Sequence, residues 1–265
     1  MAMRLMKNRT TEDYVYFLKQ FEDWFQNPLG RALLEDQRKC VDHATSRLFG
    51  FHQLEVGISH RLPLAMNSSL GHKMISVPAW CQDMPENCLV SQPHELAIES
   101  DSLDLLVFHH TLDFAAAPHQ TLREASRVLR SGGHMLILGF NPISTWGARK
   151  LMLRQRVSPW AARFIACKRI EDWLSLLNFR INSVDYHFFR LPVLSGGKEA
   201  QIRFFEYLGR RFHLPTGAYY LISAQKQVAA TIPLRPNWAK AKVIGMPVAN
   251  GLSKTSLFNK ERDDT

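Results

Sequence analysis

Two adjacent histidines and an aspartate follow a long apolar run near the middle of the chain. His109, His110 and Asp113 come directly after residues 103–108, a run typical of a strand buried on both faces. An imidazole can exchange a proton near neutral pH, so these three residues are the candidate catalytic group, with one histidine as general base. Side chains alternate along a strand, so we expect only one of the two histidines to face a pocket. A structural role for His109 in the turn is an equally good interpretation.

The segment around these residues predicts a strand, a helix and a second strand. Pro118 stands near the expected start of the helix, and Gly132-Gly133 is expected to end it. The apolar residues that recur between them at helical spacing are Leu122, Ala125, Val128 and Leu129. A second apolar run, residues 135–138, follows at once. Two parallel strands joined by a helix need a right-handed crossover, so both strands end at the edge where open α/β sheets hold their ligands.

A family resemblance rests on this segment. Its marks are an S-x-D-x-L/V pattern at the first strand, the turn with His110, Leu112 and Asp113, a proline, and the run RVLRSGGHMLILGFNP. Together these resemble the type 11 methyltransferase domain of class I S-adenosylmethionine (SAM) methyltransferases, over roughly residues 51–226. The resemblance implies an α/β, Rossmann-like seven-stranded sheet in the order 3-2-1-4-5-7-6, with its last strand antiparallel, preceded by N-terminal helices. It also implies SAM as cofactor.

The resemblance places the cofactor loop after the first expected strand, residues 51–56. Family members carry E-x-G-x-G-x-G there, and glycines let the backbone approach the cofactor closely. Glu55 and Gly57 occupy the first two places of that pattern, whereas Ser59 and Arg61 replace the later glycines. Arg61 requires the loop to open or its side chain to turn away. Glu55, Gly57 and Ser59 are therefore the expected cofactor-binding residues of this loop.

The segments after the next two expected strands, 73–77 and 88–91, both depart from the family pattern, since each lacks the acidic residue that family members usually have there. Where family members hold the ribose hydroxyls with an acid, this chain has Pro78 and Ala79. After the third strand, the resemblance places Gln92 near the adenine amine, where its amide oxygen can accept a hydrogen bond. The resemblance also places His109, at the end of the fourth strand, beside the cofactor.

Three parts of the chain surround this core in sequence. Residues 1–50 predict two helices that form an N-terminal cap and are separated at Asn27-Pro28, and residues 51–226 form the methyltransferase-like domain. Later elements are a helix at 144–153 capped by Ser144, a helix at 168–177, strands at 179–188 and 219–224, and an inserted helix at 199–211. Residues 227–265 have no sustained apolar period and predict a basic, disordered tail.

Composition limits the classes of function. No apolar run approaches the ~20 residues of a membrane helix, and no secretory leader is evident, so we expect a cytoplasmic protein without a membrane span. The four cysteines show no C-x-x-C pair or zinc-ligand spacing, and the H-H-x-x-D spacing is a poor metal site, so no metal is expected. A net charge of +9 allows an anionic partner such as nucleic acid but does not specify one. Nothing in the sequence specifies an oligomeric state.

The sequence thus favours a SAM-dependent methyltransferase that acts on a small or medium organic acceptor. The altered glycine loop and the missing ribose acid keep a second hypothesis open, a non-catalytic binding or regulatory protein of the same fold. A third, an RNA- or DNA-directed methyltransferase, has only the positive charge in its favour.

Overall fold

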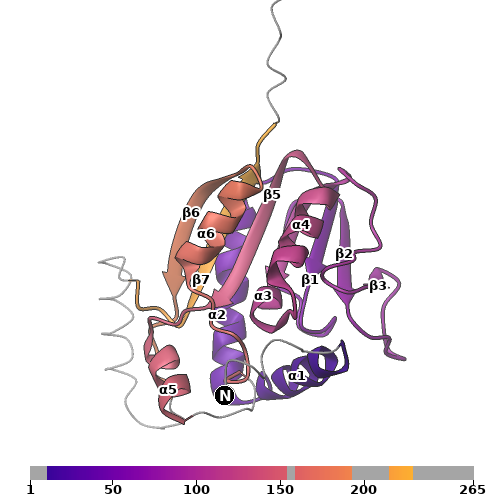
Figure 1. Ribbon diagram of the computed structural model, residues 1–265. Helices are drawn as coiled ribbons and strands as arrows, with labels where there is room; N and C mark the ends of the chain where they lie inside the picture. Colours follow the sequence, from indigo (N-terminus) through magenta and orange to yellow (C-terminus); the bar gives the residue numbers. More distant parts are fainter. Residues whose placement is uncertain (1–10, 154–158, 193–214, 229–265) are drawn as a thin grey trace, which may run out of the picture. The chain divides into compact units, whose positions relative to one another are not determined.

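The computed structural model describes residues 11–153, 159–192 and 215–228, and these residues build a seven-stranded sheet flanked by helices (Figure 1). The strands are β1 His52–Val56, β2 His72–Val77, β3 Cys88–Val90, β4 Leu103–His109, β5 Leu129–Phe140, β6 Phe179–His187 and β7 Tyr219–Lys226. Their order is β3-β2-β1-β4-β5-β7-β6. Neighbours from β3 through β5 pair in parallel, whereas β7 is antiparallel to both β5 and β6. The predicted Rossmann-like methyltransferase sheet is confirmed.

The helices cover both faces of the sheet. They are α1 Thr11–Trp24, α2 Pro28–Thr45, α3 Thr111–Phe114, α4 Pro118–Val128, α5 Thr145–Leu153 and α6 Cys167–Leu176. Figure 1 shows α4 and α6 in front of the sheet and α2 behind it. The alternation along β4 explains this arrangement, because Leu105 and Val107 join the core of α1 and α2, whereas Leu106 and Phe108 join the core of α4 and α6. A strand with apolar side chains on both faces therefore requires helices on both sides.

The first two helices are separated where the sequence predicted. Asn27 has an extended backbone, with φ −70° and ψ 153°, and Pro28 is the first residue of α2. Proline suits this place because its missing N–H would have no partner in the first turn. The aromatic stripe of α1 packs inward through Tyr14 and Phe21 and continues in Phe25, just after the helix, and all three residues are buried. The helices thus share one hydrophobic core with the sheet instead of forming a separate layer.

The helix before β5 ends earlier than predicted. Gly132-Gly133 was expected to stop it, but α4 ends at Val128 and β5 begins at Leu129. The glycines lie inside β5, where the pairing with β4 shifts register between Leu103 and Leu105. Gly132 has a φ of +81°, which glycine adopts without steric cost. The pair therefore serves a bulge in the strand, not a helix end.

The last two strands form the expected antiparallel pair at the sheet edge, from Phe179 opposite Lys226 to His187 opposite Tyr219. The predicted inserted helix at 199–211 lies outside the described residues. So does the predicted tail, apart from residues 227 and 228.

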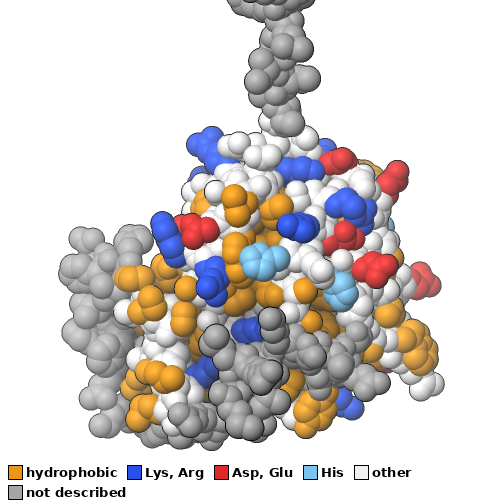
Figure 2. Space-filling view, viewed as in Figure 1, with side chains coloured by type: hydrophobic (Ala, Val, Ile, Leu, Met, Phe, Trp, Pro, Cys, Tyr) orange, Lys and Arg blue, Asp and Glu red, His pale blue; other side chains and the backbone are white. Residues whose placement is uncertain are grey.

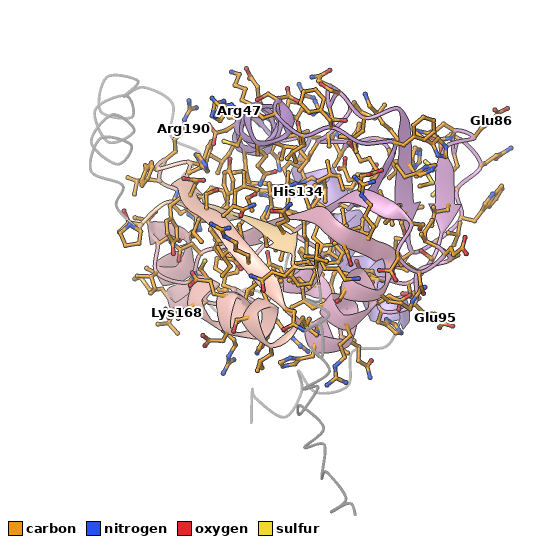
Figure 3. All side chains as sticks on the ribbon, turned by 90° about the horizontal axis from the view of Figure 1, so that it is seen from above. Arg47, Glu86, Glu95, His134, Lys168 and Arg190 are labelled. Carbon is orange, nitrogen blue, oxygen red and sulfur yellow. The ribbon has the colours of Figure 1, made fainter. Side chains whose placement is uncertain are left out.

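Surface charges are mixed on the face shown in Figure 2, where Lys and Arg side chains alternate with Asp and Glu over its upper half. Seen from above, Glu86 and Glu95 lie toward the β3 end of the sheet, and Lys168 and Arg190 lie toward the β6 end (Figure 3). The viewed face therefore carries no single basic patch of the kind that nucleic acid favours. Within the described ranges, no helix is long and apolar enough to cross a membrane.

Candidate functional site

The turn after β1 is held by a buried carboxylate. Glu55 is 1% exposed and accepts hydrogen bonds from the backbone N–H groups of Leu64 (2.9 and 3.1 Å) and Ala65 (3.1 Å). Burial raises the pKa of Glu55 to about 7, although the two backbone donors and the charge of Arg38 act in the opposite direction. The acid therefore fixes the far end of the loop, residues 57–65, against the strand that precedes it.

Gly57 stands first in this loop and is buried. Its backbone is not in the left-handed region, and a Cβ built there would meet nothing nearer than Glu55 Oε1 at 3.7 Å. Folding alone therefore does not require glycine at this position. Ser59 is also buried, and its hydroxyl accepts a hydrogen bond from the N–H of Arg61 (3.2 Å). The serine in place of the second family glycine thus stabilises the turn.

Arg61 turns away from the loop, as its place in the pattern requires. Its guanidinium contacts Glu22 on α1 at 3.0 Å and Asp83 after β2 at 2.6 Å, and the side chain is 53% exposed. His60 lies 3.5 Å from the same Asp83 carboxylate. We call Arg61, Glu22 and Asp83 the Arg61 bridge. It ties the first helix to two loops at the carboxyl edge of the sheet.

The ends of β2 and β3 lie next to this loop and are more open. Gly57 N donates to Ser76 O (3.3 Å), and the hydroxyls of Ser76 and Ser91 are 2.8 Å apart. Gln92 donates through Nε2 to the carbonyl of Pro78 (3.3 Å), a bond that does not use its amide oxygen. Trp80, which follows β2, is 72% exposed. Four of the predicted cofactor residues thus lie on the same edge of the sheet. Glu55, Gly57 and Ser59 lie at the end of β1, and Gln92 lies after β3, with β2 between these two strands.

The two histidines at the end of β4 both point toward α2, which corrects the expectation that only one would face this side. His109 Nε2 lies 3.2 Å from Gln37 Oε1, and His110 Nε2 lies 2.7 Å from Gln37 Nε2. The reason is local, since His110 has a φ of 55° and leaves the strand before alternation can turn it away. Both imidazoles are fully buried.

The hydrogen bonds fix the protonation of this group. Gln37 donates to His110 Nε2, so His110 carries its proton on Nδ1 and donates it to Asp113 Oδ2 (2.9 Å). Asp113 Oδ2 also accepts from the N–H of Phe140 (2.9 Å). Burial lowers the pKa of His110 to about 3 and raises the pKa of Asp113 well above its ordinary value. The pKa of His109 is also lowered, mainly by burial and to a smaller extent by the charges of His110 and Arg38. Both histidines are therefore neutral at pH 7.

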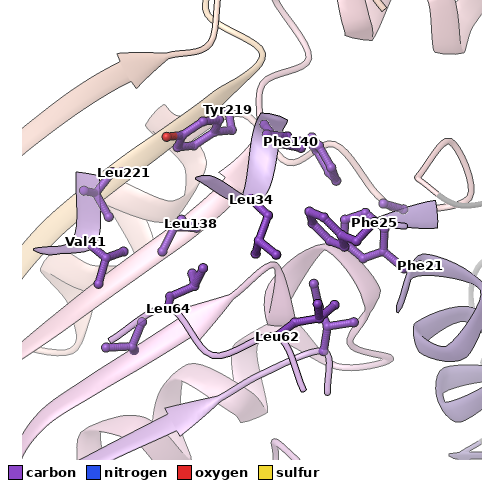
Figure 4. Close-up of a cluster of buried hydrophobic side chains, with 14 of the residues drawn as sticks. Phe21, Phe25, Leu34, Val41, Leu62, Leu64, Leu138, Phe140, Tyr219 and Leu221 are labelled. Carbon is purple, nitrogen blue, oxygen red and sulfur yellow. The ribbon is translucent and has the colours of Figure 1, made fainter. Parts of the chain in front are cut away.

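Aromatic side chains close around the histidines. The His110 ring stacks on Phe140 with centroids 4.0 Å apart, and Phe21 on α1 lies 5.5 Å from it in an edge-on arrangement. The Phe25 ring lies 5.8 Å from His109. Figure 4 shows Phe21, Phe25 and Phe140 in this buried cluster. The ends of β4 and β5 are therefore filled by the chain's own side chains.

Two residues of this region were not predicted. Gln37, buried between the apolar residues of α2, joins both histidines, and a polar residue inside an apolar stripe was the signal for it. Asn141 is the residue directly after β5. Its Nδ2 donates to the carbonyls of Pro215 and Gly217 (both 2.9 Å), and its Oδ1 accepts from Ile143 N. Asn141 thus joins the end of β5 to the segment before β7.

The sheet order, the loop after β1 and the strand ends beside it define a class of protein. Residues 66–137 match the methyltransferase domain family, and the chain belongs to the class I SAM-dependent methyltransferases. It is 33% identical over 218 residues to YafS of Escherichia coli strain K12, an uncharacterized protein, and the match covers 81% of this chain and 83% of YafS.

Solved structures agree at the level of the fold. A SAM-dependent methyltransferase from Thermotoga maritima superposes with a TM-score of 0.61 at 19% identity, covering 81% of this chain and 98% of that one. Another, from Archaeoglobus fulgidus, gives a TM-score of 0.52 at 17% identity, with 80% and 99% covered.

Proposed function

We propose that this chain is an active SAM-dependent methyltransferase that acts on a small or medium organic acceptor. The observation that carries the proposal is Gly57, because a Cβ would fit there without any clash in the protein. A glycine that the fold does not need, at the first turn of a methyltransferase sheet, is explained by a ligand that passes close to the backbone. Glycine at position 57 would leave room for the cofactor beside the backbone of this loop.

The residues of the open strand ends fit SAM in most respects. Glu55 would hold the loop, Gly57 and Ser59 would line the methionine part, and Gln92 would accept a hydrogen bond from the adenine amine through its amide oxygen. The main chain at His109 would close the site from β4. SAM, when bound, supplies a sulfonium methyl group that is already activated for displacement. The chain then has to align the acceptor and keep water away.

In this proposal His109, His110 and Asp113 hold the backbone in place and do not transfer protons in the reaction. A conjugate acid with a pKa of about 3 makes His110 a weak base at neutral pH, and Gln37 and Asp113 already occupy both of its ring nitrogens. The group instead fixes the backbone at the end of β4, where reacting groups would have to be aligned. Any proton that the acceptor loses would pass to solvent or to a group outside this cluster.

A second candidate function is a non-catalytic member of the same fold. The observations that favour it are the aromatic filling beside β4 and β5, the Arg61 bridge over the cofactor loop, and Pro78 and Ala79 where relatives place an acid. Such a protein would bind SAM weakly or not at all.

Calorimetric titration with SAM and with S-adenosylhomocysteine separates the two functions. We expect saturable binding of one ligand per chain, and a rise in melting temperature with ligand, since a ligand that binds only the folded state stabilises it. A folded protein that shows neither heat nor a melting shift at millimolar ligand would favour the non-catalytic function.

A further inference from the structure

A second group of chemically active side chains lies away from the cofactor loop, between α2 and the last two strands. Asp36 and Cys40 lie on α2, one turn apart, and His187 is the last residue of β6. One ligand atom of each residue, a carboxylate oxygen, the thiol sulfur and an imidazole nitrogen, lies within 4.8 Å of the other two. All three side chains are partly buried. We call them the 36/40/187 cluster.

We propose that the 36/40/187 cluster binds a divalent transition-metal ion of the zinc class. Thiolate, imidazole and carboxylate are the three donor types that zinc accepts, and three protein ligands leave a fourth position for water. With bonds of about 2.0–2.3 Å, tetrahedral donors lie roughly 3.3–3.8 Å apart, so the cluster has to contract by only about 1 Å. Residues four apart on a helix face the same way, which explains how Asp36 and Cys40 form half of the site.

Tyr219 supports the cluster from behind. It is the first residue of β7 and pairs with His187 across the two strands, with the rings stacked at 5.5 Å. Its hydroxyl lies 3.0 Å from Asp36 Oδ2 and 3.2 Å from Cys40 Sγ. The phenol O–H can donate a hydrogen bond to either ligand. Metal ligands are commonly oriented by such outer hydrogen bonds.

The ring of Tyr219 is fixed by packing. Figure 4 shows it in the same buried cluster as Leu34 of α2, Leu138 and Leu221. The three proposed ligands on α2 and β6, and Tyr219 on β7, therefore stand on elements whose relative positions the core determines. Sequence spacing gave no sign of this site, because the third ligand comes from a strand far along the chain.

Binding has a defined proton balance and a structural consequence. The metal ion replaces the proton of the Cys40 thiol, so one proton is released as the metal–sulfur bond forms. The bound ion would join α2 to the edge of the sheet. Gln37, next to Asp36, bonds both histidines at the end of β4, so metal loading would also restrain that group.

The test is titration of the full chain, without an affinity tag and treated with chelator, with Co²⁺ as a spectroscopic probe. We expect a thiolate-to-cobalt charge-transfer band that saturates at one ion per chain and disappears when Zn²⁺ is added. Cys40→Ser and His187→Gln should weaken binding by more than about 100-fold, and Tyr219→Phe by about tenfold. Cys81→Ser, which changes an exposed cysteine, is the matched control and should bind as the parent does.

A band that persists in Cys40→Ser, or no band in the parent protein, would overturn the proposal. If circular dichroism shows that Cys40→Ser does not fold, alkylation of the parent protein alone tests the proposal. Zn²⁺ should then protect Cys40, and not Cys81, from iodoacetamide, as read by peptide mass spectrometry. Equal alkylation of Cys40 with and without Zn²⁺ would overturn the proposal. Asp36, Cys40 and Tyr219 would then form a hydrogen-bonded cluster that binds no metal.

Discussion

The two halves of the sheet's carboxyl edge are covered in opposite ways. At the ends of β4 and β5, His109, His110 and Asp113 are fully buried under α1 and α2. At the ends of β2 and β3, Trp80 and Val90 are 72% and 45% exposed. One half is thus filled by the chain itself, and the other is left for solvent or a ligand. Under the proposed function, the cofactor would lie on the open half.

The largest expected effect is a loss of folding stability as the pH falls. It tests whether water is excluded from the covered half, as its packing indicates. The pKa of both His109 and His110 is lowered from 6.5, so the unfolded chain binds protons more readily than the folded one. The contribution of His110 to stability is complete above pH 6.5 and is lost as pH falls toward its folded-state pKa of about 3, and His109 acts in the same direction. At pH 4.5 the loss at His110 alone should be about 2.7 kcal/mol, and His109 adds to it.

Urea unfolding of the parent protein and of His109→Phe, measured from pH 7 to 4.5, checks this expectation. The variant lacks one of the two titrating rings, so its free energy of unfolding should depend less steeply on pH below 6.5 than that of the parent. Parallel curves would show that water reaches His109 and that the covered half is open.

The covered half also shows where sequence reasoning fell short. The approximate places of the strands and the break at Asn27-Pro28 followed from apolar period and proline, because these act locally or over one element. The sheet order followed from the family resemblance. The direction of His110 did not, since a φ of 55° at one residue overrides strand alternation. Gln37 could not be paired with two residues far along the chain by spacing alone. The helix end at Val128 was missed because Gly132-Gly133 serves a bulge, for which glycine is equally suited.

Glu55 should give the second largest effect, with the opposite sign. Its pKa is raised from 4.5 to about 7 by burial, so the folded state holds the proton more tightly than the unfolded chain. Its contribution to stability is complete below pH 4.5 and is lost as pH rises to about 7, by about 3 kcal/mol. Glu55→Gln should remove this decline, as unfolding free energies measured across the same window will reveal. A variant with the parent's slope would mean that water solvates the Glu55 carboxylate.

Gly57 tests whether the open half holds the cofactor. Gly57→Val should lower the affinity for S-adenosylhomocysteine by at least about 100-fold, because a branched side chain would take the ligand's place. The backbone there is not left-handed and a Cβ meets only ordinary contacts, so we expect the variant to fold. Ser59→Gly, which restores the family pattern, should bind at least as well as the parent. Calorimetry gives the affinities and circular dichroism the folding. Unchanged affinity in folded Gly57→Val would move the cofactor off this loop.

The smallest expected effect is that of the Arg61 bridge, which spans the boundary between the two halves. Arg61 and Asp83 are exposed and Glu22 is partly buried, and ion pairs of this kind add little to stability, so Arg61→Ala should leave the melting temperature almost unchanged. The bridge nevertheless ties α1 to the cofactor loop. Freeing the loop should therefore strengthen S-adenosylhomocysteine binding by no more than about tenfold, and added salt should narrow the difference from the parent.

Lys39→Ala is the matched control for this prediction, since it breaks an exposed ion pair with Glu35 on α2 away from the loop. It should change neither the affinity nor its dependence on salt. Weaker binding in Arg61→Ala would give the bridge the opposite role. The ion pairs would then hold the loop in the conformation that binds the cofactor. Arg61, at the place of a family glycine, would stabilise that conformation.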